Sequence, residues 1–224
     1  YCILEKLLSI QDLTVNFITE NSITPAVQDI SFEVNKGEIV GIVGESGCGK
    51  TTLGKAILGL ILPTAGDILF NGKIVDRKNR SITRKEMQIV FQDPYGSLNP
   101  KLTIGEAIEE PMKVHHLSGE KKSKDRVIEL LEKVQLKPEH FYRYPHQFSG
   151  GQRQRICIAR ALVLEPSFLI FDESVSALDI SVQAQVLNLI NDLKHEFNFS
   201  ALFISHDLSV VHYPLQKPEL CVGL

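Results

Sequence analysis

A run of glycines, a lysine and a threonine near residue 50 has the spacing of a phosphate-binding loop. The segment Gly44–Thr51 fits the pattern G-x-x-x-x-G-K-[ST]. Glycines let the backbone turn so that several N–H groups point at one phosphate, and the positive end of the following helix adds to the attraction. Lys50 can reach the outer phosphates, and the Thr51 hydroxyl can bind Mg²⁺. A glycine turn with a surface lysine is the alternative. The nucleotide-binding residues predicted from this loop are Gly44, Glu45, Ser46, Gly47, Cys48, Gly49, Lys50, Thr51 and Thr52.

The second chemical signal is an acidic pair that follows an apolar run. Phe168–Phe171 predicts a strand buried on both faces, and Asp172 and Glu173 come directly after it. In open α/β sheets, ligands bind beyond the carboxyl ends of the strands. We therefore expect Asp172 to hold the hydration shell of Mg²⁺ and Glu173 to polarise the water that attacks a γ-phosphate. A solvated strand end is the alternative for such a pair taken alone.

Strands and helices alternate along the chain, which predicts an α/β fold with a mostly parallel central sheet. An antiparallel β portion is expected near the N-terminus, with a polar turn at Thr19–Thr24. Between about residues 93 and 165, helical patterns, prolines and dense charges predict an inserted helical lobe. The predicted strands are Leu7–Phe17, Ile30–Val34, Glu38–Val43, Gly66–Phe70, Met87–Phe91, Phe168–Phe171 and Ala201–Ile204, and the predicted core helices are Thr51–Leu60 and Ser181–Phe197.

Composition excludes several classes of function. The 224 residues carry a formal net charge of -3, which disfavours a nucleic-acid partner because such partners need a basic surface. The longest apolar runs fall far short of the roughly 20 residues that a spanning helix requires, so a membrane connection is expected to run through a partner. The four cysteines form no close pair and are expected to be reduced thiols rather than zinc ligands.

Residues Phe148–Gln152, which read FSGGQ, resemble the signature sequence of the ABC ATPase superfamily. The residues themselves predict that Ser149 caps a helix, and that two glycines leave backbone N–H groups at its positive end. A second anion site and a simple capped helix start are both open on that evidence. The resemblance implies that this end serves the ATP held by the opposite subunit, so that two subunits enclose two nucleotides head to tail. The residues assigned to that role are Ser149, Gly150, Gly151 and Gln152.

The resemblance assigns further roles, each with an ordinary alternative. Gln92 is similar to the glutamine that touches Mg²⁺ and reports the nucleotide state to the lobe, although a lone glutamine is usually a surface residue. Asp179 lies in a segment similar to the dimer-contact loop. His206 resembles the switch histidine that contacts the γ-phosphate, and Phe17 stands where the family stacks a ring on adenine, although such a phenylalanine is more often core. The implied catalytic residues are Lys50, Glu173 and His206, and the implied magnesium ligands are Thr51, Gln92 and Asp172.

Two longer segments indicate which subfamily the chain resembles. Val90–Pro100 and Ser176–Leu187 are similar to the ATPases of oligopeptide and dipeptide importers. The resemblance implies a peripheral subunit on the cytoplasmic side of a membrane that hydrolyses ATP, with Mg²⁺, to drive uptake of peptides or a related small solute. Its implied partners are a second ATPase subunit, identical or not, integral membrane permease subunits and, indirectly, an extracytoplasmic solute-binding protein.

The chain departs from that subfamily at two places. Ser174 stands where proline is usual, and residues 212–224 contain two prolines without a strand or helix pattern. We therefore expect a truncated or frameshifted chain, for which a non-catalytic cassette that at most binds nucleotide is the alternative function. A soluble ABC ATPase outside transport is a weaker alternative. The predicted boundaries are a cassette at 7–211, with its core at about 7–92 and 166–211 and its lobe at about 93–165, and an unmatched tail at 212–224.

Overall fold

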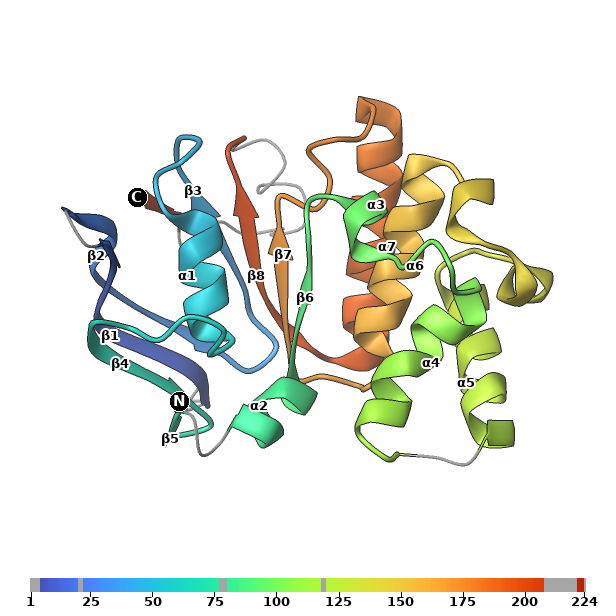
Figure 1. Ribbon diagram of the computed structural model, residues 1–224, viewed down its shortest axis with the longest axis horizontal. Helices are drawn as coiled ribbons and strands as arrows, with labels where there is room; N and C mark the ends of the chain where they lie inside the picture. The colour runs from blue at the N-terminus through green and yellow to red at the C-terminus, as the bar shows by residue number, and fades with distance from the viewer. Residues whose placement is uncertain (1–4, 20–21, 77–79, 118–119, 208–220, 224) are drawn as a thin grey trace.

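The computed structural model describes residues 5–19, 22–76, 80–117, 120–207 and 221–223. Two sheets with a short helix between them lie on one side of the molecule, and a group of helices lies on the other (Figure 1). This arrangement confirms the predicted α/β fold with a helical lobe.

A five-stranded parallel sheet forms the centre. Its strand order is β6-β7-β8-β3-β9, and every neighbouring pair is parallel. Both β7 and β8 are buried at every position, which explains their nearly continuous apolar sequences. Because the strands are parallel, the residues after their carboxyl ends all meet at one edge. The strands are β3 (Ile39–Val43), β6 (Met87–Val90), β7 (Phe168–Asp172), β8 (Ser200–Ser205) and β9 (Cys221–Gly223).

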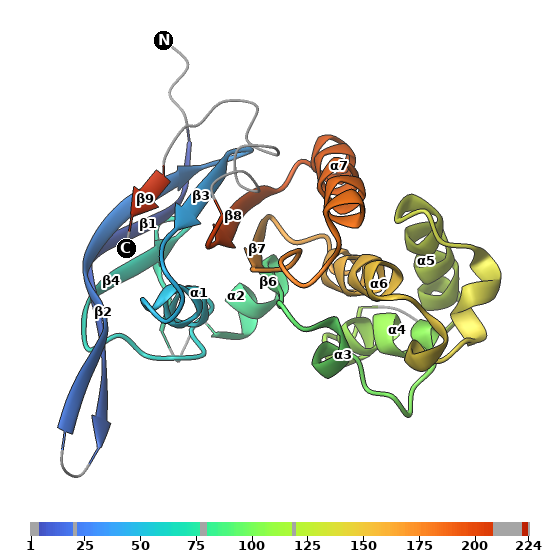
Figure 2. The same ribbon diagram turned by 90° about the horizontal axis from the view of Figure 1, so that it is seen from above.

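The antiparallel sheet has the order β2-β1-β4-β5, and its first two strands are longer than the sequence predicts. The chain reverses direction within the predicted turn at Thr19–Thr24, but that prediction is too long, because pairing continues to Thr19 opposite Ser22. The outer part of this hairpin is a two-stranded ribbon that projects from the body (Figure 2), so it lacks the alternation of a half-buried strand. The strands are β1 (Lys6–Thr19), β2 (Ser22–Asn35), β4 (Ala65–Phe70) and β5 (Lys73–Ile74).

Helix α1 (Lys50–Ile57) lies between the two sheets (Figure 2). Its buried residues Leu53, Ala56 and Ile57 belong to one apolar cluster with side chains of both sheets. The helix ends earlier than predicted, and Gly59 follows with a positive φ of 66°. Helix α2 (Arg80–Glu86), which no sequence pattern had predicted, precedes β6.

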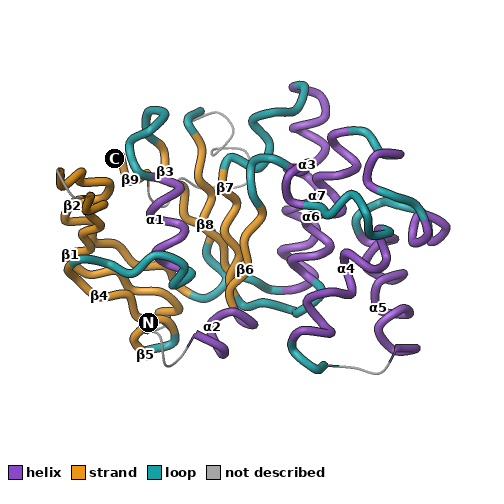
Figure 3. Tube along the Cα trace, in the orientation of Figure 1, coloured by secondary structure: helices purple, strands orange, loops and turns teal. Residues whose placement is uncertain are grey.

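The helical lobe runs from α3 to α6, and Figure 3 shows it as part of the helical half of the molecule. Its apolar cluster is continuous with the face of the parallel sheet that α7 covers. The long helix α7 (Ile180–Phe197) confirms the predicted helix from residue 181. The lobe helices are α3 (Pro94–Ser97), α4 (Ile104–Val114), α5 (Glu120–Lys133) and α6 (Gly150–Leu162), with 3-10 turns η1 (Pro138–Tyr142) and η2 (Pro145–Gln147).

The expectation of a tail without strand structure is wrong for three residues. Strand β9 pairs in parallel with β3, with Gly41 opposite Cys221 and Val43 opposite Gly223. A sheet edge offers unpaired backbone groups, and backbone pairing demands little of the side-chain pattern. The rest of that segment, residues 212–220 and 224, lies outside the described residues. Among the helices that the structure describes, none has the length and apolar character needed to cross a bilayer.

Candidate nucleotide site

The phosphate loop joins the end of β3 to the start of α1, as the sequence predicts. Gly47 and Gly49 have positive φ angles of 84° and 104°. A Cβ atom at Gly49 would lie 1.9 Å from the carbonyl oxygen of Ala26 on β2, which no side chain can do. The third glycine of the motif is therefore required both by its backbone conformation and by its close approach to the neighbouring strand.

Lys50 is almost fully buried within this loop, with 4% of its surface exposed. Its Nζ donates hydrogen bonds to the carbonyl oxygens of Gly44 at 2.8 Å and Glu45 at 2.6 Å. The Sγ atom of the half-buried Cys48 lies 3.6 Å from the same Nζ. A surface lysine is excluded by this geometry, because the ammonium group lies inside the turn and holds its two sides together.

Thr51 and Asp172 meet across the junction of α1 and β7. The Thr51 Oγ1 donates a hydrogen bond to Asp172 Oδ1 at 3.2 Å. Burial raises the pKa of the Asp172 carboxyl; the Thr51 hydrogen bond opposes that rise and the charge of Glu173 adds to it. The described residues include no group of three His, Cys, Asp or Glu side chains that could hold a metal. A hydroxyl beside one carboxylate suits Mg²⁺, which takes few protein oxygens and completes its shell with phosphates and water.

Glu173 lies between two basic groups, and its backbone is strained. Its φ is 46°, and its N–H donates to the carbonyl oxygen of Ile204 at 2.9 Å. Its Oε1 is 3.9 Å from Lys50 Nζ, and its Oε2 is 3.5 Å from His206 Nδ1. A non-glycine residue with positive φ persists only where the surroundings enforce it, and such residues gather at active sites. The structure thus brings together the three residues predicted to be catalytic.

Gln92 reaches the loop that carries Glu173. Its Nε2 donates to Ser176 Oγ at 3.4 Å, and that hydroxyl donates to the carbonyl oxygen of Glu173 at 2.8 Å. Sequence reasoning had placed Ser176 only in the dimer-contact segment and had missed this bridge. Its hydroxyl lies three residues after Glu173, and that spacing was the available signal. Ser174, in the same loop, is 2% exposed, and its hydroxyl has no hydrogen-bond partner among the described residues.

The residues of the signature sequence begin α6. Ser149 is its N-cap and accepts a hydrogen bond from the N–H of Gln152 at 3.3 Å, and the Gln152 side chain accepts from the Ser149 N–H at 3.0 Å. This capping box confirms the predicted helix cap. Gly151 packs so closely against α7 that a Cβ atom would lie 2.5 Å from Val182 Cγ1. The glycines therefore also allow the two helices to approach.

Two other predicted residues lie on the surface. Asp179 is the N-cap of α7, but its side chain makes no capping bond, and it precedes Ile180, which is 85% exposed. Phe17 on β1 is 45% exposed. The core alternative for Phe17 is therefore wrong, and its ring is accessible.

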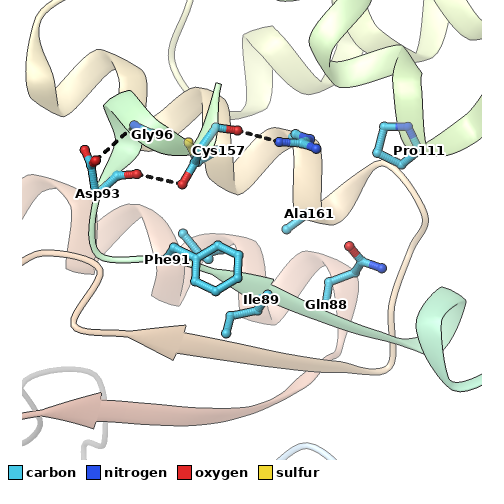
Figure 4. Close-up of a pocket in the computed structure, with 11 residues that line it drawn as sticks. Gln88, Ile89, Phe91, Asp93, Gly96, Pro111, Cys157 and Ala161 are labelled. Atoms are coloured by element: carbon cyan, nitrogen blue, oxygen red, sulfur yellow. Dashed lines mark hydrogen bonds between the residues drawn. The ribbon is translucent and has the colours of Figure 1, made fainter. Parts of the chain in front are cut away.

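A groove that the sequence did not reveal runs between β6 and the lobe (Figure 4). It has a volume of about 570 Å³ and is lined by Gln88, Phe91, Pro111 and Cys157, among others. A second hollow of about 390 Å³ shares Gln88 and Pro111 with it and extends toward α2. Burial raises the pKa of the Cys157 thiol to about 12, so this thiol is protonated at neutral pH. The groove lies directly beside the segment that carries Gln92.

Comparison with known proteins decides the family. The ABC transporter family model matches residues 27–176, which include the phosphate loop, the signature helix and the acidic pair. The chain belongs to the ABC transporter family. Among curated relatives, the oligopeptide transport ATP-binding protein OppF of Bacillus subtilis is 52% identical over 214 residues, covering 93% of this chain and 70% of OppF. The oligopeptide transport protein AppF of the same organism is 53% identical over 192 residues, covering 84% of this chain and 58% of AppF.

Solved structures of ABC cassettes have the same fold. The dimeric post-hydrolysis cassette MJ0796, bound to ADP and phosphate, superposes with a TM-score of 0.82 at 28% identity, covering 92% of this chain and 91% of that one. The cassette cbiO1 of Clostridium perfringens gives 0.81 at 29% identity, covering 92% and 81%. The glutathione import ATP-binding protein GsiA of Pectobacterium atrosepticum is 46% identical over 217 residues, or 92% of this chain and 35% of GsiA. This chain is thus an ABC ATPase cassette that spans 70% or less of the length of these three curated relatives.

Proposed function

We propose that this cassette binds and hydrolyses ATP to drive the import of peptides or a related small solute. The observation that carries the proposal is the cluster of Lys50, Asp172 and Glu173 at the carboxyl edge of the parallel sheet. The relatives named for oligopeptide and glutathione transport support the solute class.

The groups of the cluster divide the chemistry of phosphoryl transfer between them. The Lys50 ammonium and the N–H groups of the phosphate loop stabilise negative charge on the phosphates. Glu173 accepts the proton of the attacking water, or orients that water, while His206 beside it positions the γ-phosphate. Mg²⁺, which Thr51, Asp172 and Gln92 would hold, supplies charge neutralisation at the phosphates. Phe17 offers an accessible ring for the adenine.

The signature helix supplies the other half of a nucleotide site. We assign Ser149, Gly150, Gly151 and Gln152 to the ATP of the opposite subunit, with Asp179 at the contact between subunits. The dimeric form of the MJ0796 cassette supports this arrangement. A helix start with two glycines presents free N–H groups to a γ-phosphate, and the helix dipole favours the anion.

The groove between β6 and the lobe is the place where we expect a membrane subunit to dock. Its walls contain both apolar side chains, such as Phe91, and the Arg160 guanidinium. That guanidinium donates a hydrogen bond to the carbonyl oxygen of Ser97 at 2.7 Å. A segment bound there would contact the chain on both sides of Gln92. Nucleotide-dependent movement of the lobe would thereby be transmitted to a permease, and the cassette would be peripheral, on the cytoplasmic side of the membrane.

Two substitutions test the proposal. In Glu173→Gln, the amide keeps the shape of the side chain but cannot accept a proton, so we expect nucleotide binding to persist while hydrolysis falls by about 10²–10⁴-fold. In Lys50→Ala, both binding and hydrolysis should weaken, because the ammonium group in the loop is lost. Phosphate release and fluorescent-nucleotide binding measure the two steps. Wild-type turnover in both variants would overturn the assignment of Lys50 and Glu173 to the site. No turnover in the parent chain with Mg-ATP would favour a non-catalytic cassette.

A further inference from the structure

A buried arginine in the signature helix contacts the segment that follows Gln92. The guanidinium carbon of Arg153 lies 3.6 Å from the centre of the Tyr95 ring, and Arg153 is only 6% exposed. Its Nε donates to the carbonyl oxygen of Pro145 at 2.7 Å, while Nη1 is buried without a hydrogen-bond partner among the described residues. A buried charge that is only partly hydrogen-bonded costs stability, so the position of Arg153 points to a role other than stability.

Tyr95 lies in the first turn of the short helix α3, whose N-cap fixes its backbone. Asp93 caps α3, accepting from the N–H groups of Tyr95 at 2.8 Å and Gly96 at 3.0 Å, and Figure 4 shows the second of these bonds. The Tyr95 residue is nevertheless 64% exposed. Its ring therefore contributes little to the apolar core, and one face of the ring packs against Arg153.

These contacts complete a continuous connection between two distant parts of the site. The carbonyl oxygen of Glu173 accepts from Ser176, and Ser176 Oγ accepts from Gln92. Three residues along the chain from Gln92, Tyr95 stacks on Arg153, whose N–H donates to the carbonyl oxygen of Ser149 at 2.9 Å. The loop of the catalytic glutamate is thus linked to the N-terminus of the signature helix.

We propose that the Tyr95–Arg153 stack is a clamp that sets the position of the signature helix end relative to Gln92. The proposal rests on the proposed function, in which Ser149 completes the ATP site of the opposite subunit. Tyr95 and Arg153 are positioning residues, since they act through Gln92 and Ser149 and are not assigned contacts with nucleotide. Loss of the stack should leave nucleotide binding to the single subunit unchanged and weaken the ATP-dependent dimer roughly tenfold, an effect between those of an exposed and a desolvated cation–π contact.

A double-mutant cycle in the Glu173→Gln background measures the clamp. Tyr95→Leu, Arg153→Gln and the double variant are compared for the dissociation constant of the dimer with Mg-ATP, by analytical ultracentrifugation, and for fluorescent-nucleotide affinity. If the two residues act as one clamp, the double variant is no weaker than the worse single variant. Tyr95→Phe keeps the ring and should dimerise like the parent chain. If Arg153→Gln folds poorly, the Tyr95 variants still test the clamp, because Tyr95 is exposed and its substitution leaves the core intact.

Mixed dimers show on which site the clamp acts. In a dimer of one Tyr95→Leu chain and one Lys50→Ala chain, one site has both halves intact. The Tyr95→Leu chain supplies its phosphate loop, and the Lys50→Ala chain supplies its clamp. The turnover of this dimer should equal that of a wild-type chain paired with Lys50→Ala; lower turnover would mean that Tyr95 acts on its own nucleotide and would overturn the clamp. Additive losses in the cycle would overturn it as well. Absence of any ATP-dependent dimer in the Glu173→Gln chain would instead count against the proposed function.

Discussion

Substitution of Gly49 tests the phosphate loop, because the geometry around this residue determines how much stability the protein should lose. In Gly49→Ala, an L-residue is forced to a φ of 104°, which costs about 1–3 kcal/mol. The new Cβ would also overlap the carbonyl oxygen of Ala26, 1.9 Å away, and moving that backbone costs about 1–3 kcal/mol more. The sum is about 4 kcal/mol, which for a chain of this size lowers the Tm by roughly 12 °C.

Gly47→Ala is the matched control. Its φ of 84° carries a similar backbone penalty, but nothing lies within 4 Å of the added Cβ. We therefore expect a loss of about 1.5 kcal/mol, or roughly 5 °C in Tm. Thermal melts of the three proteins without nucleotide give the comparison. If the two variants melt within about 2 °C of each other, the close contact between the loop and β2 does not determine the loop's stability, and the reasoning is wrong.

The other predictions concern the metal ligands, the dimer and the thiols. Asp172→Asn removes a buried carboxylate whose pKa is raised by burial, so the Tm without nucleotide should rise. The Mg²⁺ dependence of ATP binding should be lost, and an unchanged Mg²⁺ titration would remove Asp172 from the metal site. Ser149→Arg and Lys50→Ala chains should each be inactive alone, and an equal mixture should regain about a quarter of wild-type turnover, because half the dimers hold one intact site; no recovery would contradict the shared site. At pH 7.5 N-ethylmaleimide should label Cys48 well before Cys157, because a pKa of about 12 leaves fewer than about one Cys157 thiol in ten thousand ionised. The labelling rate of Cys157 should rise with pH. Equal labelling rates of the two cysteines, measured by mass spectrometry, would refute the burial of Cys157.

The parts of the fold that the sequence predicted are those where side chains dictate structure. The apolar runs that became β7 and β8 are buried at every position, and Gly47 and Gly49 of the phosphate loop have positive φ angles. The N-cap of α6 was likewise predicted, because serine is a favoured residue type at that position.

The parts that the sequence missed depend on backbone pairing or on contacts between distant segments. The outer half of β2 is mostly exposed and lacks alternation of buried and exposed positions, and β9 is too short for any periodic pattern. The stack of Tyr95 on Arg153 joins residues far apart in the chain, and neither residue type signals the other. The bridge from Gln92 through Ser176 to Glu173 also required the sheet to place the ends of β6 and β7 side by side.

The insertion of the lobe between β6 and β7 has a consequence for how the chain folds. These strands are neighbours in the sheet, with Val90 opposite Phe171, yet the whole lobe separates them in sequence. Their pairing must close a long loop, and closure entropy is repaid only when the strands meet. A lobe that collapses first shortens that loop, because its helices make mostly local contacts and form quickly. We therefore expect the lobe to acquire hydrogen-exchange protection before β7 during refolding, so that the segment proposed to respond to nucleotide also brings the central strands together as the chain folds.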